Sequence, residues 1–97
     1  MQLKLPHSFP RHEAVARVQR LLIEAKPKLA GKVTIEEERW EGDILHFAFT
    51  TQGQSISGQL EVKAKEYELN AKLPFMMRMF EGKIEKMIEE QSKQMLK

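Results

Sequence analysis

The chain has 97 residues, a formal net charge of +2 and no cysteine. This length predicts a single domain over residues 1–97 with one thin core. The missing cysteine excludes a disulfide scaffold, a thiolate zinc site and a thiol nucleophile, and the small net charge argues against nucleic-acid binding. The first residues lack the apolar stretch of a signal peptide, and no segment approaches the ~18 apolar residues of a spanning helix. We therefore expect a soluble, cytoplasmic protein with no integral membrane segment.

A short strand and a helix are predicted first. Residues 2–5 alternate polar and apolar side chains, which is typical of a strand. Apolar residues then recur every three or four positions and predict a helix that begins near Pro10, with Ser8 as its N-cap. The apolar stripe consists of Val15, Val18, Leu22, Ala25 and Leu29. Pro27 is expected to end or kink this helix, because proline disfavours helical backbone at the residue before it.

Four further segments alternate apolar and polar residues and predict an antiparallel meander. They are residues 32–40, 44–51, 55–64 and 67–73. Strict alternation in the first of these segments places Ile35 on one face and Trp40 on the other. Gly58, in the middle of the third segment, indicates a bulge or a closely packed helix.

The last predicted helix begins at Pro74 and has one apolar face. That face consists of Met76, Met77, Phe80, Ile84, Met87 and Ile88. The order of elements is therefore β-α-β-β-β-β-α. Because a sheet with one apolar face needs a cover, the economical arrangement packs both helices on that face. The predicted fold is α+β, an antiparallel sheet of four to five strands with two helices packed on one face.

The predicted core takes the apolar side of each element. It consists of Val15, Val18, Leu22, Val33, Ile35, Leu45, Phe47, Phe49, Ile56, Leu60, Val62, Leu69, Ala71, Phe80, Ile84 and Ile88. If the ring of Phe47 is buried, the change Phe47→Ala would cost about 3–5 kcal/mol.

The titratable residues form no recognisable catalytic or metal-binding pattern. His7, His12 and His46 lack metal-ligand spacing, and the sequence has no phosphate-binding glycine loop and no metalloprotease signature. His46 is expected on the polar face of its strand, opposite Leu45 and Phe47. We therefore expect no enzyme activity, no catalytic residue, no cofactor and no bound metal.

Charged residues gather in two places, and both patterns are typical of solvated surfaces. The acidic residues are expected along an exposed strand edge, where charges discourage strand aggregation. They are Glu36, Glu37, Glu38, Glu41 and Asp43. The first helix is basic, but it contains the i,i+4 pairs Glu13–Arg17 and Glu24–Lys28, as solvated helix faces do. No exposed aromatic residues accompany these charges, so nucleic acid is not an expected partner.

The segment from Leu73 to Phe80 is unusually apolar. One helix face cannot bury all of its large side chains, and methionine suits adaptable interfaces. The segment is either a wide core-facing stripe with one or two exposed methionines or a contact for a partner, a lipid surface or a second copy. The expected interaction surface is Met76, Met77, Met79, Met95 and Leu96, buried in a homodimer or against a partner protein.

Several pieces along the whole chain stand out together. They are His7, the hairpin Trp40-Glu-Gly-Asp-Ile-Leu-His-Phe47, Ile56-Ser-Gly-Gln-Leu-Glu-Val62, and Leu73-Pro-Phe-Met-Met running into Gly82-Lys-Ile-Glu85. In order and spacing they resemble the polyhydroxyalkanoic acid system protein family, also called granule-region proteins. The resemblance implies a bacterial protein encoded near genes for the synthesis and breakdown of storage polyester. It implies no mechanism and no catalytic residue.

Two functions of different classes are open. The first is a binding or structural module of polyhydroxyalkanoate storage, which associates with a polyester granule surface or a partner protein through its C-terminal helix. The alternative is a carrier that binds an acyl-type or other apolar ligand between sheet and helices. In so short a chain, a cavity of the ~300 Å³ that a ligand needs is expected to be hard to keep. An internal cavity lined by Phe47, Phe49 and Leu60 would favour the carrier.

Overall fold

The computed structural model describes residues 1–95 and the side chains of residues 1–93. The strands within this part are β1 (Gln2–Pro6), β2 (Thr34–Glu41), β3 (Ile44–Thr51), β4 (Gln54–Val62) and β5 (Glu66–Lys72). The helices are α1 (Arg11–Leu29), α2 (Phe75–Arg78) and α3 (Glu81–Met95). The fold is α+β, and the order of strands and long helices is the predicted one.

The five strands form one antiparallel sheet in the order β1-β5-β4-β3-β2. Strands β2 to β5 form the predicted meander, and the N-terminal strand β1 pairs with β5. Gln52 and Gly53 both have positive φ, 52° and 76°, in the turn between β3 and β4. This geometry matches the right-handed twist of the flanking strands and so favours a two-residue hairpin.

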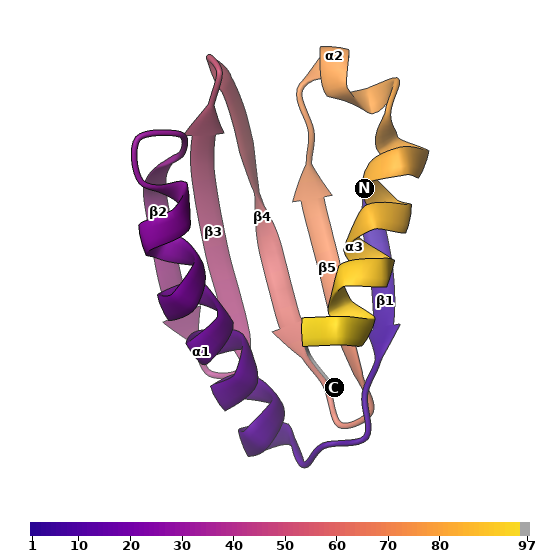
Figure 1. Cartoon of the computed structure of the whole chain (residues 1–97). Coiled ribbons are helices and arrows are strands. Elements are labelled where there is room, and N and C mark those ends of the chain that lie inside the picture. Colours follow the sequence, from indigo (N-terminus) through magenta and orange to yellow (C-terminus); the bar gives the residue numbers. More distant parts are fainter. Residues whose placement is uncertain (96–97) are drawn as a thin grey trace.

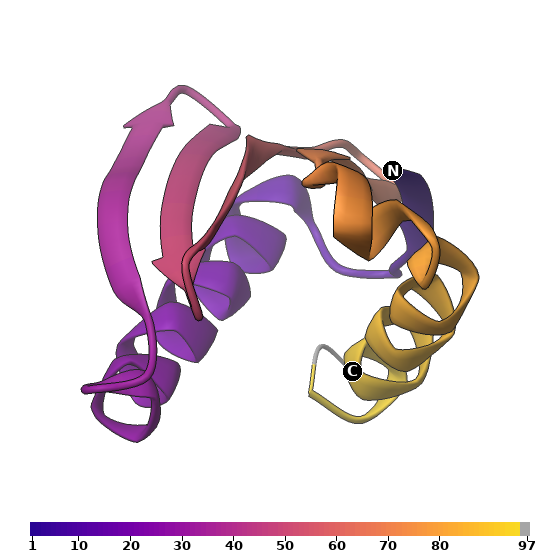
Figure 2. The ribbon, with the colours of Figure 1, turned by 90° about the horizontal axis from the view of Figure 1, so that it is seen from above.

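Both long helices lie on the same face of the sheet, as predicted. Figure 1 looks onto this face, with α1 over the half that contains β3 and α3 over the half that contains β1. Seen from above, the sheet curves around the two helices (Figure 2). Because α1 and α3 cover different halves, the middle of the inner face lies between them.

The ends of α1 differ from the prediction. Pro10, not Ser8, is the N-cap residue, and no side chain caps the helix. The first helical bond runs from the Ala14 N–H to the Pro10 carbonyl, at 2.9 Å. Pro27 does not end the helix, which continues to Leu29. A proline this near the C-terminus removes only one intrahelical hydrogen bond.

The C-terminal helix is divided in two. The single helix predicted from Pro74 is a short α2 followed by α3, and Met79 and Phe80 lie between them. Phe80, predicted in the core, lies at this break and is 54% exposed.

A β-bulge reverses the expected orientation of half of β2. Ile35 pairs with Phe49, but Glu37 pairs with Ala48, so the register shifts between these residues. Trp40 then pairs with Leu45 and packs against the core, although strict alternation placed it on the polar face. A bulge adds one residue to one strand and so exchanges the two faces beyond it.

The core lies between the sheet and the two long helices. Its central cluster is Leu5, Ala14, Val18, Leu45, Val62 and Tyr67. Three of these residues were in the predicted core, whereas Leu5, Ala14 and Tyr67 were not. Ile35 was placed there wrongly, because it lies on the edge strand β2 and is 43% exposed.

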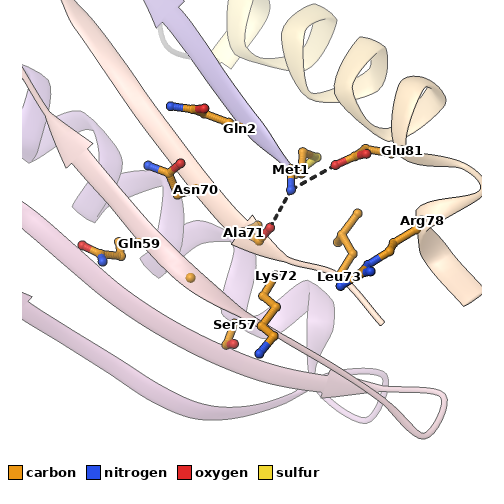
Figure 3. A pocket seen from close by; sticks show the side chains of 11 residues that line it. Met1, Gln2, Ser57, Gln59, Asn70, Ala71, Lys72, Leu73, Arg78 and Glu81 are labelled. Atoms are coloured by element: carbon orange, nitrogen blue, oxygen red, sulfur yellow. Dashed lines mark hydrogen bonds and ion pairs between the residues drawn. The ribbon is translucent and has the colours of Figure 1, made fainter. Parts of the chain in front are cut away.

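The amino group of Met1 joins three elements. It donates to the Ala71 carbonyl at 2.8 Å and lies 3.0 Å from Glu81 Oε1 (Figure 3). These contacts connect β1 and β5 with the first turn of α3. The beginning of α3 is therefore held against the sheet by a charged contact as well as by apolar packing.

Candidate apolar binding site

An open apolar cleft lies between α1 and α3 on the inner face of the sheet. It consists of two hollows of about 450 and 370 Å³, which share Leu21, Leu60 and Leu69. Phe47 and Phe49 line the larger hollow. Apolar side chains make almost the whole surface, so the cleft suits an aliphatic ligand and offers little to a polar one.

Sequence periodicity explains the apolar surface of the cleft. Phe47 and Phe49 are two residues apart on β3 and face the same side, with ring centroids 6.2 Å apart. Leu60 on β4 and Leu69 on β5 are register partners and extend the floor toward α3. Leu21 on α1 forms one wall. Three adjacent strands and a helix therefore present apolar groups to one space.

The structure has an open cleft here and not the internal cavity that was expected to favour a carrier. The long helices lie over different halves of a curved sheet (Figure 2), and residues of α1, α3 and the sheet line the cleft. Phe47, Phe49 and Leu60 are half-buried as a result. They were predicted to face the helices, which is confirmed, and they line a ligand-sized space rather than a closed core.

A pair of opposite charges stands at the edge of the cleft. The β-bulge turns Glu38 toward the helices, where it lines the larger hollow beside Phe47, its cross-strand partner. Glu38 Oε1 lies 2.8 Å from the Lys26 Nζ of α1. The sequence predicted Glu38 on an exposed strand edge, and Glu38 is exposed on the edge strand β2. Only its face differs from the prediction, because alternation does not reveal the bulge.

A half-buried histidine supports one end of the fold. His7 Nε2 donates to the Lys63 carbonyl at 2.9 Å, and His7 Nδ1 accepts from the Phe9 N–H at 3.2 Å. Its ring centroid is 4.7 Å from that of Tyr67. His7 therefore connects the β1–α1 loop to the end of β4, a structural role that its sequence position does not show.

Tyr67 is buried under the first turns of α1. Its hydroxyl donates a long hydrogen bond of 3.5 Å to the Ala14 carbonyl. Burial raises the pKa of the Tyr67 phenol, and the nearby Arg17 guanidinium opposes part of this rise. Arg17 itself lies over the Phe9 ring and pairs with Glu13, the i,i+4 partner predicted from the sequence.

The histidines His12 and His46 lie apart from the cleft. His46 is on the outer face of β3, where its Nε2 lies 3.2 Å from Glu41 Oε1. His12 is exposed on α1. Arg39 pairs with Glu37 and Glu41 along the edge strand β2. Within residues 1–95, no three His, Cys, Asp or Glu side chains are placed to hold one metal ion.

A larger hollow of about 720 Å³ lies beside Met1 and Gly58, away from the cleft (Figure 3). Its two cationic side chains, Lys72 and Arg78, are exposed, and Glu81 is engaged by the Met1 amino group. Mixed and exposed polar groups give this hollow no defined ligand chemistry. The apolar cleft is the better candidate, because its surface is almost wholly apolar.

A second apolar feature lies at α2. Phe75, Met76, Met79 and Phe80, here called the α2 patch, are 79, 68, 80 and 54% exposed. Met77 is half-buried. Met95 ends α3, its side chain lies outside the described part, and Leu96 lies outside the described residues. Met76 and Met79 were predicted from the sequence as part of an interaction surface. Phe75 was not, although it belongs to the same apolar segment.

Comparison with known proteins places the chain in a family. The family model described as "Putative polyhydroxyalkanoic acid system protein" matches residues 1–96. The chain belongs to this family. No curated protein and no solved structure gives a significant match. In the part of the chain described, none of the helices combines the length and the apolar character needed to cross a membrane.

Proposed function

We propose that this protein is a binding module of polyhydroxyalkanoate storage that holds an acyl chain in the cleft between α1 and α3. One observation carries the proposal: Phe47, Phe49 and Leu60 line an open apolar hollow of about 450 Å³. This volume lies within the range of roughly 300–1,000 Å³ that small-molecule sites occupy. Family membership supports an acyl ligand, because hydroxyalkanoic acids are acyl compounds.

The physical reason for binding is the exchange of apolar surface between ligand and cleft. Each methylene group that leaves water contributes about 0.8 kcal/mol. The half-buried aromatic floor loses its own contact with water at the same time. The proposed role is binding without catalysis, in the cytoplasm, where a ligand is held and released.

Calorimetric titration of the whole chain with methyl octanoate tests this function. We expect saturable binding that Leu21→Ser weakens about fivefold, because a half-buried leucine contributes about 1 kcal/mol of apolar contact. The matched control is Gln19→Ser, which makes the same new residue on an exposed position of α1. No binding by the wild type, or equal weakening by both variants, would contradict the proposal.

The α2 patch favours a second function, attachment to the surface of a polyester granule. Four large apolar side chains are exposed within six residues, whereas such side chains on monomer surfaces are normally scattered singly. An apolar polyester is a suitable partner, because the patch presents no charged group except Arg78 at its edge. This function concerns the beginning of the C-terminal helical segment and is compatible with ligand binding in the cleft.

Co-sedimentation with polyhydroxyalkanoate particles tests the attachment. We expect Met79→Ser to reduce the bound fraction, because it removes one of the most exposed residues of the patch. The control is Ile23→Ser, which removes an equally apolar residue that is 68% exposed on α1. Equal binding of the two variants would argue against the α2 patch as the attachment site.

A homodimer is the remaining predicted use of the α2 patch. A second copy would cover the same side chains that a granule would. Light scattering distinguishes the two partners. A dimer mass that Met79→Ser converts to a monomer mass would assign the patch to self-association.

A further inference from the structure

The charged pair at the edge of the cleft is reachable by a ligand. The Glu38 side chain is 27% exposed and that of Lys26 is 46% exposed. Both therefore keep contact with solvent on the open side of the cleft. Glu38 also touches the apolar hollow directly, next to Phe47. A ligand on the aromatic floor would have Glu38 beside it, with the Lys26 ammonium group next to the Glu38 carboxylate.

The position of Glu38 is unfavourable for packing alone. Without the bulge, alternation from Ile35 would place Glu38 on the outer face; with it, Glu38 lies on the inner face among apolar residues. The Glu38 carboxylate keeps part of its contact with solvent, and an exposed pair with a lysine contributes little to stability. An apolar side chain would pack better beside Phe47. Bulges are frequent next to binding sites, where they re-aim a side chain.

We propose that the cleft recognises a 3-hydroxyacyl chain in preference to a plain acyl chain. The ligand hydroxyl donates to the Glu38 carboxylate, and the ligand carbonyl oxygen accepts from the Lys26 ammonium group. Glu38 Oε1 and Lys26 Nζ are 2.8 Å apart, and only three carbon atoms separate the hydroxyl oxygen of a 3-hydroxyacyl unit from its carbonyl oxygen, so both can reach the pair at once. The rest of the chain lies over Phe47 and Phe49. The inference rests on the acyl-binding function proposed above and specifies its ligand class.

The test compares two neutral esters, methyl octanoate and methyl 3-hydroxyoctanoate, in calorimetric titrations of the whole chain. Neutral probes avoid repulsion between a ligand carboxylate and Glu38. We expect the hydroxy ester to bind about tenfold more tightly, as hydrogen bonds to charged groups allow. In Glu38→Leu this preference disappears, while methyl octanoate binds as tightly as before or more tightly, because the cleft has become more apolar. Lys26→Met reduces the preference in the same way.

The control variant is Glu41→Leu, which removes a carboxylate from the same strand on its exposed side, where Glu41 pairs with Arg39 and His46. It is expected to keep the preference. Equal affinity of the wild type for both esters overturns the inference and leaves the acyl-binding function standing. A preference that survives Glu38→Leu also overturns it. If neither ester binds, the acyl-binding function fails, and the inference fails with it.

Discussion

Gly58 in β4 and Asn70 in β5 approach so closely that no side chain fits between them. A Cβ atom on Gly58 would stand 2.0 Å from the Asn70 carbonyl oxygen and 2.8 Å from the Ala71 Cα. Gly58 and Ala71 are register partners, so the contact belongs to the middle of the sheet. The sequence position of Gly58 indicated a bulge or a packed helix. The glycine instead marks a close approach of two strands.

Gly58→Ala is expected to destabilise the fold by about 1–3 kcal/mol, because the neighbouring atoms are backbone and must move. Chemical denaturation measures the change. Gly82→Ala is the matched control, since a Cβ there meets nothing within 4 Å and alanine favours a helix by up to about 1 kcal/mol. The two substitutions should have opposite signs, and a Gly58→Ala variant as stable as the wild type would refute the close approach.

The single tyrosine allows a direct titration of a buried group. Tyr67 is the only tyrosine in the chain, and burial raises the pKa of its phenol above the ordinary value of 10.0. Absorbance of the phenolate against pH should give a midpoint above that value in the folded protein. A midpoint at or below 10.0 would show that the ring is not buried.

The raised pKa of Tyr67 also predicts a loss of stability in alkali. The folded chain holds the phenol proton more tightly than the unfolded chain does, so the contribution is complete below pH 10.0 and is lost as the pH rises above it. Tyr67→Phe should lack this part of the pH dependence. Comparing the unfolding free energies of the two proteins at several pH values cancels the titration of the lysines, and parallel curves would contradict the prediction.

His7 and His12 should respond differently to the same substitution. His7→Ala removes the partners of the Lys63 carbonyl and the Phe9 N–H, which should cost about 1–3 kcal/mol. His12→Ala changes an exposed helix residue and should stay within about 0.5 kcal/mol of the wild type. Thermal unfolding of the two variants distinguishes them. Equal stability of the two variants would contradict a structural role of His7.

Phe47→Ala should be milder than a buried phenylalanine predicts. The ring is half-buried in the cleft, so we expect about 1–2 kcal/mol rather than the ~3–5 kcal/mol of a closed core. Leu45→Ala is the control on the same face of β3, where the side chain is 3% exposed, and it should cost about 2–5 kcal/mol. Urea denaturation measures the unfolding free energy of both variants. A larger loss of stability for Phe47→Ala than expected would indicate that the cleft is closed.

Period-two alternation was sufficient to predict the sheet. The segment 44–51 matches β3 at both ends, and its face with Leu45, Phe47 and Phe49 is the inner one. Alternation failed in β2, because one extra residue reverses the faces beyond Ile35 and leaves no compositional trace. Trp40 and Glu38 were therefore assigned to the wrong side. The edge of the cleft could not be predicted without that reversal.

The cleft depends on the distance between α1 and α3, which the periodicity of the sequence does not predict. The sequence shows that α1 and α3 have apolar faces, but it does not show how far apart they lie on a curved sheet. Leu69 was predicted in the core, and it lines an open space. The α2 patch was predicted in part, because Met76 and Met79 exceed what one helix face can bury, whereas Phe75 was not named and Phe80 was assigned to the core.

The measurement that bears most directly on the cleft is an NMR titration of the methyl groups of the whole chain with methyl octanoate. Saturable shifts are expected at the methyl groups of Leu21, Leu60 and Leu69, which line both hollows of the cleft, and a smaller response is expected at exposed Ile23 on α1. Absent shifts at the three leucines, or shifts confined to Met76 and Met79 of the α2 patch, would contradict binding in the cleft.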